Sequence, residues 1–284
     1  MTKKILITGA NGQLGHEMRN ALKGNNRFEC IFTDVAELDI CNAEAVKQTI
    51  ADNHIDYIVN CAAYTQVDKA EDNAELCKKI NTDAVENLAR AAADYGARMI
   101  HISTDYVFNG RGYRPYTEDV VPDPQSVYGS TKLEGEKILT DICPESIIIR
   151  TAWLYSPYGN NFVKTMLHLG EEREELSVGT PTCAADLAQA ILVILQADTF
   201  VPGTYHFSDE GACSWYDFTV TIHRLAGITT CRVTPIRSDE YPSKAHRPFY
   251  SVLDKSKIKK TYGLTIPHWY ESLSNCIKLL QETH

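Results

Sequence analysis

The chain has 284 residues, and its 37 acidic residues outnumber its 28 Lys and Arg, so its net charge of −9 argues against nucleic-acid binding. Its basic cluster, 255–260, is short and is expected to be a solvated helix face. Nine cysteines without a CxxC motif indicate neither a zinc site nor a disulfide framework, and Cys30, Cys61 and Cys143 are expected in the core of a protein from a reduced compartment. No apolar run reaches the length of a membrane span and no signal peptide precedes the first strand, so a cytoplasmic location is expected.

Apolar runs of strand length alternate with helical segments from the N-terminus onward. This alternation is the βαβ pattern of a parallel sheet. The expected strands lie at 4–8, 28–33, 56–62, 99–103 and 146–151, and the expected helices at 13–23, 43–52, 73–96 and 128–141. The predicted fold class is therefore α/β, a Rossmann-type doubly wound parallel sheet.

After Trp153 the pattern loosens into short elements rich in Pro, Tyr and Trp. We predict a dinucleotide-binding domain at 1–154 and a smaller α/β substrate-binding lobe, formed mainly by 155–179 and 209–284. A helix over 184–197 and a strand at 203–207 are expected to return to the first domain, which would place 180–208 with it.

The first strand breaks into three glycines, Gly9, Gly12 and Gly15, in a GxxGxxG spacing. The first permits a sharp turn, the second lets the backbone approach a pyrophosphate, and the third lets the next helix pack closely on the strand. The N-terminus of that helix offers N–H groups to phosphates. This context favours a dinucleotide site over an ordinary loop.

An acid, Asp34, stands at the end of the second apolar run. Such an acid accepts hydrogen bonds from a ribose 2′-OH and repels a 2′-phosphate, which favours NADH. Because Arg19 or Lys23 could approach, the choice between NADPH and NADH stays open.

Tyr128 and Lys132 form a second motif, in which a phenol and an ammonium lie four positions apart near the start of a predicted helix. Positions i and i+4 share a helix face, so both side chains are expected to point into one cleft. There the ammonium would lower the pKa of the phenol and make Tyr128 a usable general acid. Thr104, just after a predicted strand, could donate a second hydrogen bond to a carbonyl oxygen. The alternative is structural: Thr104 caps a turn and Tyr128 is a packed aromatic.

Together these motifs resemble the extended short-chain dehydrogenase/reductase superfamily. The glycine-rich turn, Ser-Thr-Asp-Tyr-Val-Phe at 103–108 and Tyr128-x-x-x-Lys132 carry that resemblance. More specific strings make the chain similar to the dTDP-4-dehydrorhamnose reductase family from residue 4 to about residue 270. These strings lie at 60–71, 150–155, 159–162, 179–182 and 247–248.

The resemblance implies NADPH- or NADH-dependent reduction of the C4 ketone of dTDP-4-dehydro-6-deoxy-L-mannose to dTDP-L-rhamnose, a precursor of cell-surface polysaccharide. In that reaction Tyr128 protonates the C4 oxygen, Lys132 binds the nicotinamide ribose and tunes the phenol, and Thr104 steadies the oxygen. Besides Tyr128 and Lys132, the implied cofactor contacts are Gly9, Asn11, Gly12, Gln13, Leu14, Gly15, Asp34, Asp39, Ile40, Ala62, Ala63 and Tyr64. Besides Thr104, the implied substrate contacts are Thr65, Val67, Asp68, Asp105, Tyr106, Trp153, Asn161 and Arg247.

Two of these implied contacts have a plain structural alternative. The indole of Trp153 suits the apolar 6-methyl edge of a deoxy-sugar, and it suits core packing equally well. The planar fork of Arg247 suits pyrophosphate oxygens. Without Pro248 and the resemblance, Arg247 would be interpreted as a surface arginine.

The sequence departs from the family pattern after Val178, where several further residues usually precede Gly179. That loop would lie near the substrate mouth, so its absence leaves the set of substrate contacts incomplete. The resemblance also implies that a homodimer could be bridged by a divalent ion such as Mg²⁺, for which Glu17 matches best. No metal site is predicted.

Two other functions remain open. One is another extended short-chain dehydrogenase acting on a nucleotide sugar, such as an epimerase or reductase; a dehydratase is disfavoured because Asp105 is followed by Tyr106 rather than by glutamate. The other is a non-catalytic regulatory subunit of the same fold. Retention of Tyr128 and Lys132 favours catalysis over a regulatory role.

Overall fold

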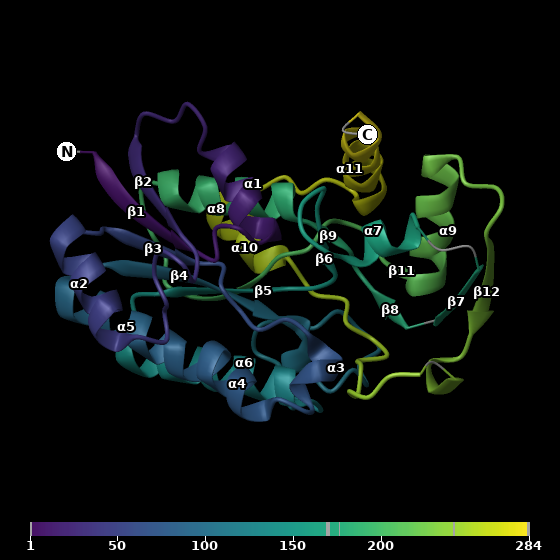
Figure 1. Cartoon of the computed structure of the whole chain (residues 1–284), viewed down its shortest axis with the longest axis horizontal. Helices are drawn as coiled ribbons and strands as arrows, with labels where there is room; N and C mark the ends of the chain where they lie inside the picture. The colour runs from purple at the N-terminus through teal and green to yellow at the C-terminus, as the bar shows by residue number, and fades with distance from the viewer. Residues whose placement is uncertain (1, 169–170, 176, 241, 283–284) are drawn as a thin grey trace.

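A six-stranded parallel sheet forms the centre of the molecule (Figure 1). The computed structural model describes residues 2–168, 171–175, 177–240 and 242–282. The strand order is β10-β5-β4-β3-β1-β2, and every neighbouring pair is parallel. The strands are β1 (Lys3–Thr8), β2 (Phe28–Thr33), β3 (Tyr57–Asn60), β4 (Arg98–Thr104), β5 (Ile147–Thr151) and β10 (Gly203–His206). The predicted Rossmann-type α/β class is confirmed.

Helices cover both faces of this sheet (Figure 1). One face is covered by α1 (Gln13–Ala21), α8 (Ala184–Gln196) and α10 (Ser256–Tyr262). The other is covered by α2 (Ala43–Asn53), α5 (Ala84–Tyr95) and α6 (Val127–Ile142). Such a sheet is buried on both faces, which is why its strands are near-continuous apolar runs in the sequence.

The long helix expected at 73–96 is interrupted. It consists of α4 (Ala74–Lys78), a π-helical turn η1 (Lys79–Asp83) and α5. In the turn, the Asn81 amide accepts from the Tyr64 N–H at 2.9 Å and donates to the Tyr64 carbonyl at 3.1 Å. These two bonds tie the helix to the loop after β3, and π-turns of this kind are common at functional sites.

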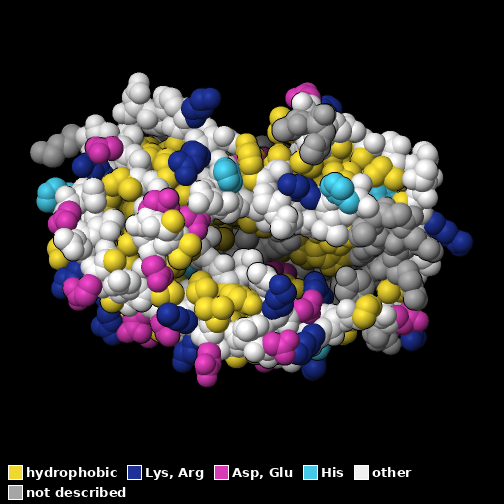
Figure 2. Space-filling model, viewed as in Figure 1, with side chains coloured by type: hydrophobic (Ala, Val, Ile, Leu, Met, Phe, Trp, Pro, Cys, Tyr) yellow, Lys and Arg dark blue, Asp and Glu magenta, His cyan; other side chains and the backbone are white. Residues whose placement is uncertain are grey.

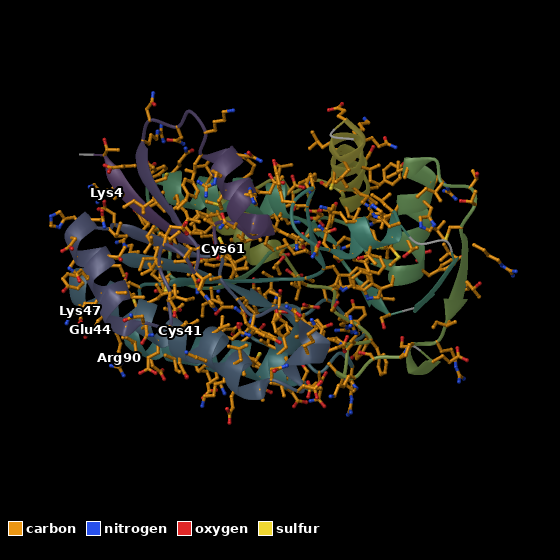
Figure 3. The ribbon with its side chains drawn as sticks, viewed as in Figure 1. Lys4, Cys41, Glu44, Lys47, Cys61 and Arg90 are labelled. Atoms are coloured by element: carbon orange, nitrogen blue, oxygen red, sulfur yellow. The ribbon has the colours of Figure 1, made fainter. Side chains whose placement is uncertain are left out.

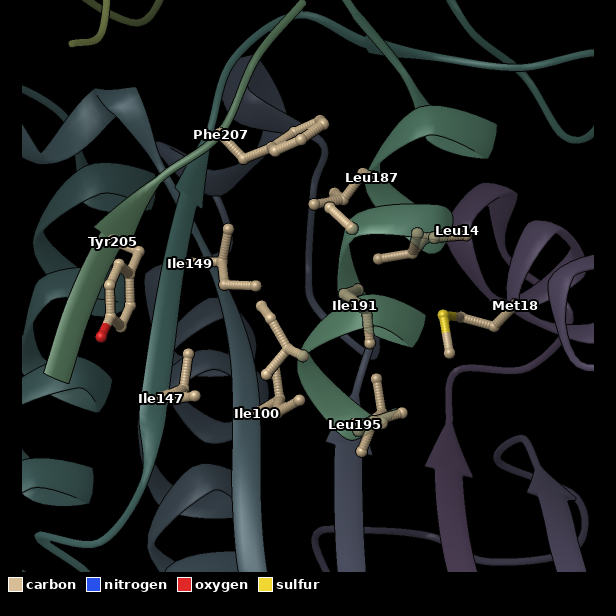
Figure 4. Close-up of a cluster of buried hydrophobic side chains, with 14 of the residues drawn as sticks. Leu14, Met18, Ile100, Ile147, Ile149, Leu187, Ile191, Leu195, Tyr205 and Phe207 are labelled. Carbon is tan, nitrogen blue, oxygen red and sulfur yellow. The ribbon is translucent and has the colours of Figure 1, made fainter. Parts of the chain in front are cut away.

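The core under α8 shows how the sheet is held together (Figure 4). Ile147 and Ile149 of β5 face Leu187 and Ile191 of α8, and all four are fully buried. Burying one such side chain stabilises the fold by roughly 1.5–3 kcal/mol. This packing therefore holds the strands in place, and with them the residues at the strand ends.

A smaller lobe lies on the right of Figure 1. It contains three two-stranded sheets, β11-β8, β12-β7 and β6-β9, and an aromatic core around Phe218. Its elements are β6 (Leu154–Tyr155), α7 (Phe162–Met166), β7 (Glu171–Glu175), β8 (Val178–Gly179), β9 (Thr182–Cys183), β11 (Cys213–Ser214), α9 (Trp215–Ala226), β12 (Arg232–Ile236), η3 (Ser238–Glu240) and α11 (Trp269–Glu282).

The structure bears on several sequence expectations in this part of the chain. Strand β10 joins the main sheet and helix α8 packs against it, as expected, while the domain boundaries themselves stay a prediction. Leu176, just before the departure from the family pattern at 178–179, lies outside the described residues. The solvated face expected at 255–260 is wrong for Lys255, which is buried because its ammonium pairs with Glu210 at 3.3 Å and donates to the Asp209 carbonyl. No helix in the described ranges has the length and apolar character to cross a membrane.

Candidate active site

The strand order reverses between β1 and β3, because β2 lies on the far side of β1. In open α/β sheets, ligands bind in the crevice outside the carboxyl ends of strands at such a switch point. Gly9 and Gly12 follow β1, and 61–63 follow β3. Figure 3 shows Cys61 near the middle of the molecule, beyond the end of β3. The predicted glycine-rich turn therefore lies at the switch point.

The close approach of these two turns depends on glycine. Gly9 has φ +63°, and a Cβ there would lie 2.7 Å from Ala62 Cα. A Cβ on Gly15 would lie 2.5 Å from Ala10 Cα, whereas one on Gly12 would meet Gly9 O at 3.2 Å. Gly9 and Gly15 thus bring together the backbones of β1, α1 and the loop after β3, and Gly12 remains at the surface of the crevice.

A cavity of about 400 Å³ extends from this turn toward β2. Seven predicted cofactor residues line it: Gly9, Gly12, Asp34, Asp39, Ile40, Ala62 and Ala63. The sequence reasoning missed Val35, Leu38, Cys41, Cys61, Leu76, Lys79 and Ile80, which complete its wall. Val35 and Leu76 are 72% and 47% exposed, so apolar side chains are open to a ligand at this cavity. Proximity to Asp34 in the sequence could have indicated Val35, Leu38 and Cys41, whereas the other four lie far from it along the chain.

Three other predicted cofactor residues support the wall without lining it. The Asn11 N–H donates to Asp34 Oδ2 at 3.0 Å, Gly15 packs on the turn, and Tyr64 is held through its backbone by Asn81. Asp34 Oδ1 accepts from the Val35 N–H at 2.8 Å, so the carboxylate is oriented by backbone donors. Arg19, considered as a partner for a 2′-phosphate, places its guanidinium 4.2 Å above the Phe32 ring.

A second cavity, of about 480 Å³, adjoins the first and shares Gly12, Cys61 and Ala63 with it. Figure 2 shows a hollow near the centre of this face, with apolar side chains exposed between the main domain and the smaller lobe. The predicted residues that line this cavity are Gln13, Leu14, Thr65, Val67, Thr104, Asp105, Tyr106, Tyr128, Lys132, Trp153 and Asn161. The sequence reasoning missed Ile102, Ser103, Thr151, Ala152, Leu154, Gly159 and Asn160.

Helix α6 presents Tyr128 and Lys132 to this cavity one turn apart, which confirms the predicted shared face. The helix begins after Ser126, whose hydroxyl accepts from the Gly129 N–H at 3.1 Å. The ring of Tyr106 meets that of Tyr128 edge-on, with centroids 5.4 Å apart. These contacts orient the phenol toward the end of β4.

Thr104 ends β4 and has both of the roles considered for it. Its hydroxyl caps η2 (Asp105–Val107) by accepting from the Tyr106 N–H at 3.2 Å, and it lines the cavity. It also donates to Asp105 Oδ1 at 3.0 Å. Because a threonine has one O–H, donation to a substrate oxygen requires this hydroxyl to rotate away from Asp105.

The expected net fall in the pKa of Tyr128 is wrong, because this pKa is raised. Burial raises the pKa of Tyr128 above its usual value, a hydrogen bond with Thr104 opposes this, and Asp105 adds to it. Burial also lowers the pKa of Lys132 to about 8. The Lys132 amine donates to the Ile102 carbonyl at 2.7 Å and is 1% exposed. Desolvation therefore outweighs any attraction between the two groups.

Asp105 and Trp153 combine structural roles with a place in the cavity wall. Burial raises the pKa of Asp105 to about 6, and its Oδ2 has no hydrogen-bond partner among the described residues. Trp153 stacks on Trp215 with centroids 3.5 Å apart, and its φ of +49° is unusual for a bulky residue. Strain of this kind is common at ligand sites. Trp153 thus packs in the lobe and also faces the cavity.

Arg247 and Asp68 lie away from this cavity and bind each other. Arg247 Nη2 donates to Asp68 Oδ2 at 2.7 Å. Burial opposes ionisation of Asp68, but the Ala245 N–H and Arg247 hold its pKa below the usual range. Arg247 lines a third cavity of about 270 Å³ with Ser238, Ser243, Lys244, Ala245, His246 and Phe249. This cavity neighbours the second across α3 (Val67–Ala70), because Val67 lines the second while Asp68 binds Arg247.

Asn161 and Glu17 are engaged in local structure. Asn161 caps α7 by accepting from the Lys164 N–H at 3.1 Å, and its amide donates to the Ser156 carbonyl at 2.8 Å. Glu17 is buried, accepts from Asn20 at 3.1 Å, and has a raised pKa because of burial. Within the described ranges, no group of three or more His, Cys, Asp or Glu side chains is placed to hold a metal ion.

The parallel sheet, the glycine-rich turn at its switch point and the Tyr–Lys pair facing the adjoining cavity define a nicotinamide-dependent oxidoreductase of the short-chain dehydrogenase/reductase class.

Comparison with known proteins gives the family. The family described as RmlD substrate binding domain matches residues 3–282, and the chain belongs to it. A protein of Aggregatibacter actinomycetemcomitans named dTDP-4-dehydrorhamnose reductase is 39% identical over 286 residues, which cover 96% of this chain and 97% of the relative.

Two solved structures show the same similarity. A dTDP-4-dehydrorhamnose reductase from Clostridium acetobutylicum is 48% identical with a TM-score of 0.93, covering 98% of this chain and 99% of that one. The Bacillus anthracis enzyme of that name, in complex with NADP, is 37% identical with a TM-score of 0.93, covering 98% and 100%.

Proposed function

We propose that this chain is a dTDP-4-dehydrorhamnose reductase. It uses NADPH or NADH to reduce the C4 ketone of dTDP-4-dehydro-6-deoxy-L-mannose to dTDP-L-rhamnose. The observation that carries this proposal is that Thr104, Tyr128 and Lys132 meet in a cavity that adjoins the glycine-lined one. The nine cysteines are all free, which supports a location in the reducing cytoplasm.

The residues of the first cavity fit a dinucleotide. A Cβ on Gly9 would collide with Ala62. The glycine therefore lets the two backbones lie close together, with no side chain between them and a bound diphosphate. Asp34 stands where it can accept from a ribose hydroxyl, and Val35 and Leu76 offer apolar surface to a base. When bound, the nicotinamide supplies the hydride that reduces C4.

Tyr128 provides the proton that neutralises the oxygen on C4. Because burial raises its pKa, the phenol stays protonated at neutral pH, which is the form a general acid needs. An alkoxide is more basic than a phenolate, so the transfer remains favourable. Thr104 lies at the end of β4 beside the phenol, and its hydroxyl donates a second hydrogen bond to the substrate oxygen once it has turned away from Asp105, which lines the same cavity.

The sugar and the nucleotide diphosphate occupy different surfaces. Thr65, Val67 and Trp153 present mixed polar and apolar contacts in the second cavity, which suits a 6-deoxy-sugar. Arg247 is oriented by Asp68 and by Ser243, whose hydroxyl accepts from Arg247 Nε at 2.9 Å. A guanidinium held in this way binds phosphate oxygens with directional hydrogen bonds.

The decisive test is oxidation of NADPH and NADH by the purified protein with dTDP-4-dehydro-6-deoxy-L-mannose, followed by chromatography of the product. We expect consumption of the cofactor and formation of dTDP-L-rhamnose in equal amounts. Tyr128→Phe is the matched control, since it removes only the phenol oxygen. If the cofactor binds but no dTDP-L-rhamnose forms, the proposal fails and a different nucleotide sugar or a regulatory role takes its place.

A further inference from the structure

Lys132 stands at the end of a chain of buried polar groups that begins in the loop after β3. The Ala62 N–H donates to Asn60 Oδ1 at 3.1 Å. Asn60 Nδ2 lies 3.0 Å from His101 Nδ1, and His101 Nε2 lies 3.2 Å from Lys132 Nζ. Asn60, His101 and Lys132 are each at most 1% exposed, so water does not compete for these bonds.

The Ala62 N–H fixes the donor-to-acceptor direction of this series of hydrogen bonds. A backbone N–H only donates, so Ala62 makes Asn60 Oδ1 an acceptor and turns the Asn60 NH₂ group toward His101. The hydroxyl of Thr8 strengthens this orientation by donating to the same oxygen at 2.7 Å. Because Nδ1 of His101 then accepts, the single proton of the neutral ring lies on Nε2 and points at Lys132.

An ammonium is a poor partner for that Nε2–H. The group –NH₃⁺ carries three donors and no acceptor. In a protonated Lys132, an Nζ–H would therefore face the Nε2–H of His101, with no acceptor between them. A neutral amine has a lone pair that accepts from Nε2–H, and its own N–H can still donate to the Ile102 carbonyl. The geometry therefore discriminates between the two protonation states of the lysine.

We propose that Asn60 and His101 are positioning residues, which stabilise the neutral amine of Lys132 and thereby set the pH range over which the site works. The inference rests on the proposed function, which gives Lys132 its place beside Tyr128. Burial acts in the same direction, because it lowers the pKa of Lys132 and holds that of His101 well below its usual value, where the ring is neutral.

Other charged or titratable groups around Lys132 do not supply this discrimination. Glu136 on its own helix raises the pKa of Lys132, but Arg150 on β5 pairs with that carboxylate at 2.6 Å and reduces its effect. The remaining groups nearby are Cys77 on α4, Glu71 after α3, Asp105 on η2 and Tyr128 on α6. None of them directs a fixed N–H at Nζ.

The test reverses the donor-to-acceptor direction of the hydrogen bonds from Asn60 to Lys132. Asn60→Asp retains an acceptor for the Ala62 N–H and replaces the NH₂ donor by a second acceptor. His101 must then carry its proton on Nδ1 and offer Nε2 as an acceptor to the lysine ammonium. We expect the titration midpoint of Lys132 to rise by at least about one pH unit, measured from ¹³Cε-lysine NMR of the whole protein and assigned with Lys132→Met. The alkaline limb of the kcat profile should shift with it. Because the new carboxylate also raises this midpoint by its charge, reversal itself is measured from the ¹⁵N shifts of His101, whose proton should move from Nε2 to Nδ1 in Asn60→Asp; a proton that stays on Nε2 would overturn the proposal.

Thr8→Val is the matched control. It removes the other donor to Asn60 Oδ1 at equal burial and leaves the direction of the chain unchanged, so the midpoint should stay at the wild-type value. Equal midpoints in Asn60→Asp and the wild type would overturn the proposal, as would equal shifts in the two variants.

A measurement on the wild type keeps the proposal testable even if Asn60→Asp does not fold. The ¹⁵N shifts of His101 should show the proton on Nε2, and a proton on Nδ1 would refute the proposed direction. Both NMR measurements are independent of turnover. A protein that shows the expected midpoints and no reductase activity would therefore refute the proposed function alone.

Discussion

The two adjoining cavities are built in different ways. The first lies where β1 and β3 end, and glycines let the backbones of their turns approach closely there. The second takes side chains from β4, β5, α6 and the segment around Trp153, which are far apart in the sequence. A site made from neighbouring strand ends is encoded locally, whereas a site made from distant side chains depends on how the lobe packs. The cofactor end should therefore respond mainly to added bulk, and the substrate end to lost functional groups.

The largest expected effect is at the substrate end. Tyr128→Phe should lower kcat by about 10²- to 10⁴-fold, the usual contribution of general acid catalysis, while cofactor affinity is retained. Lys132→Ala should damage both turnover and cofactor binding. Steady-state kinetics and fluorescence titration of NADPH measure the two effects. A kcat near the wild-type value in Tyr128→Phe would show that another group donates the proton.

At the cofactor end, added bulk should be felt as lost stability. Gly15→Ala places a Cβ against Gly9 and Ala10, and we expect a loss of about 1–3 kcal/mol in the free energy of unfolding, as for other overpacked sites. Gly12→Ala is the control, because its Cβ would meet Gly9 O at 3.2 Å, whereas the Cβ on Gly15 would come closer to the same atom, so the smaller loss is expected for Gly12→Ala. Urea unfolding compares them, and equal losses would contradict the packing role assigned to Gly15.

Loss of a charged donor should weaken substrate binding more than chemistry. Arg247→Ala should raise the KM for the dTDP-sugar about tenfold with a small change in kcat, because one charge-assisted hydrogen bond to phosphate is removed. Arg90→Ala removes an exposed arginine that pairs with Glu86 on α5 and should leave KM unchanged. If both variants gave the same KM, Arg247 would have no role in binding the diphosphate.

Cofactor preference should change when the acid of the first cavity is removed. Asp34→Ala should shift the ratio of kcat/KM values toward NADPH by about tenfold, because a 2′-phosphate no longer meets a carboxylate. Asp39→Ala changes a carboxylate in the same cavity and should weaken both cofactors to the same extent. An unchanged ratio in Asp34→Ala would assign the preference to other residues.

The last prediction concerns the pH dependence of stability rather than the two cavities. Burial raises the pKa of Asp209 to about 8, so this carboxyl stays protonated in the folded protein while it ionises in the unfolded chain above about pH 4. Stability is therefore lost as pH rises from about 4 to about 8, by at most about 1.4 kcal/mol per unit. Asp209→Asn should flatten this slope in urea unfolding. A slope identical to that of the wild type would mean that Asp209 is ionised in the folded state.

Local patterns in the sequence predicted the main sheet well. The strand expected at 28–33 is β2, and the helix expected at 128–141 is α6 at 127–142. Parallel strands that are buried on both faces are apolar runs in the sequence, and the helices between them show apolar residues every three to four positions. Both patterns can be recognised without knowing which distant residues pack against them. The π-turn at 79–83 was missed because it depends on the bonds between Asn81 and Tyr64.

The sequence by itself determined the elements of the fold, the glycine turn and the shared face of Tyr128 and Lys132, since each depends on residues a few positions apart. The tertiary structure decided the contacts between residues that are far apart in the sequence. It paired Arg247 with Asp68 and buried Lys255, and desolvation reversed the expected shift of the Tyr128 pKa. Local geometry follows from covalent spacing, whereas burial and charge pairing exist only after remote segments have packed together.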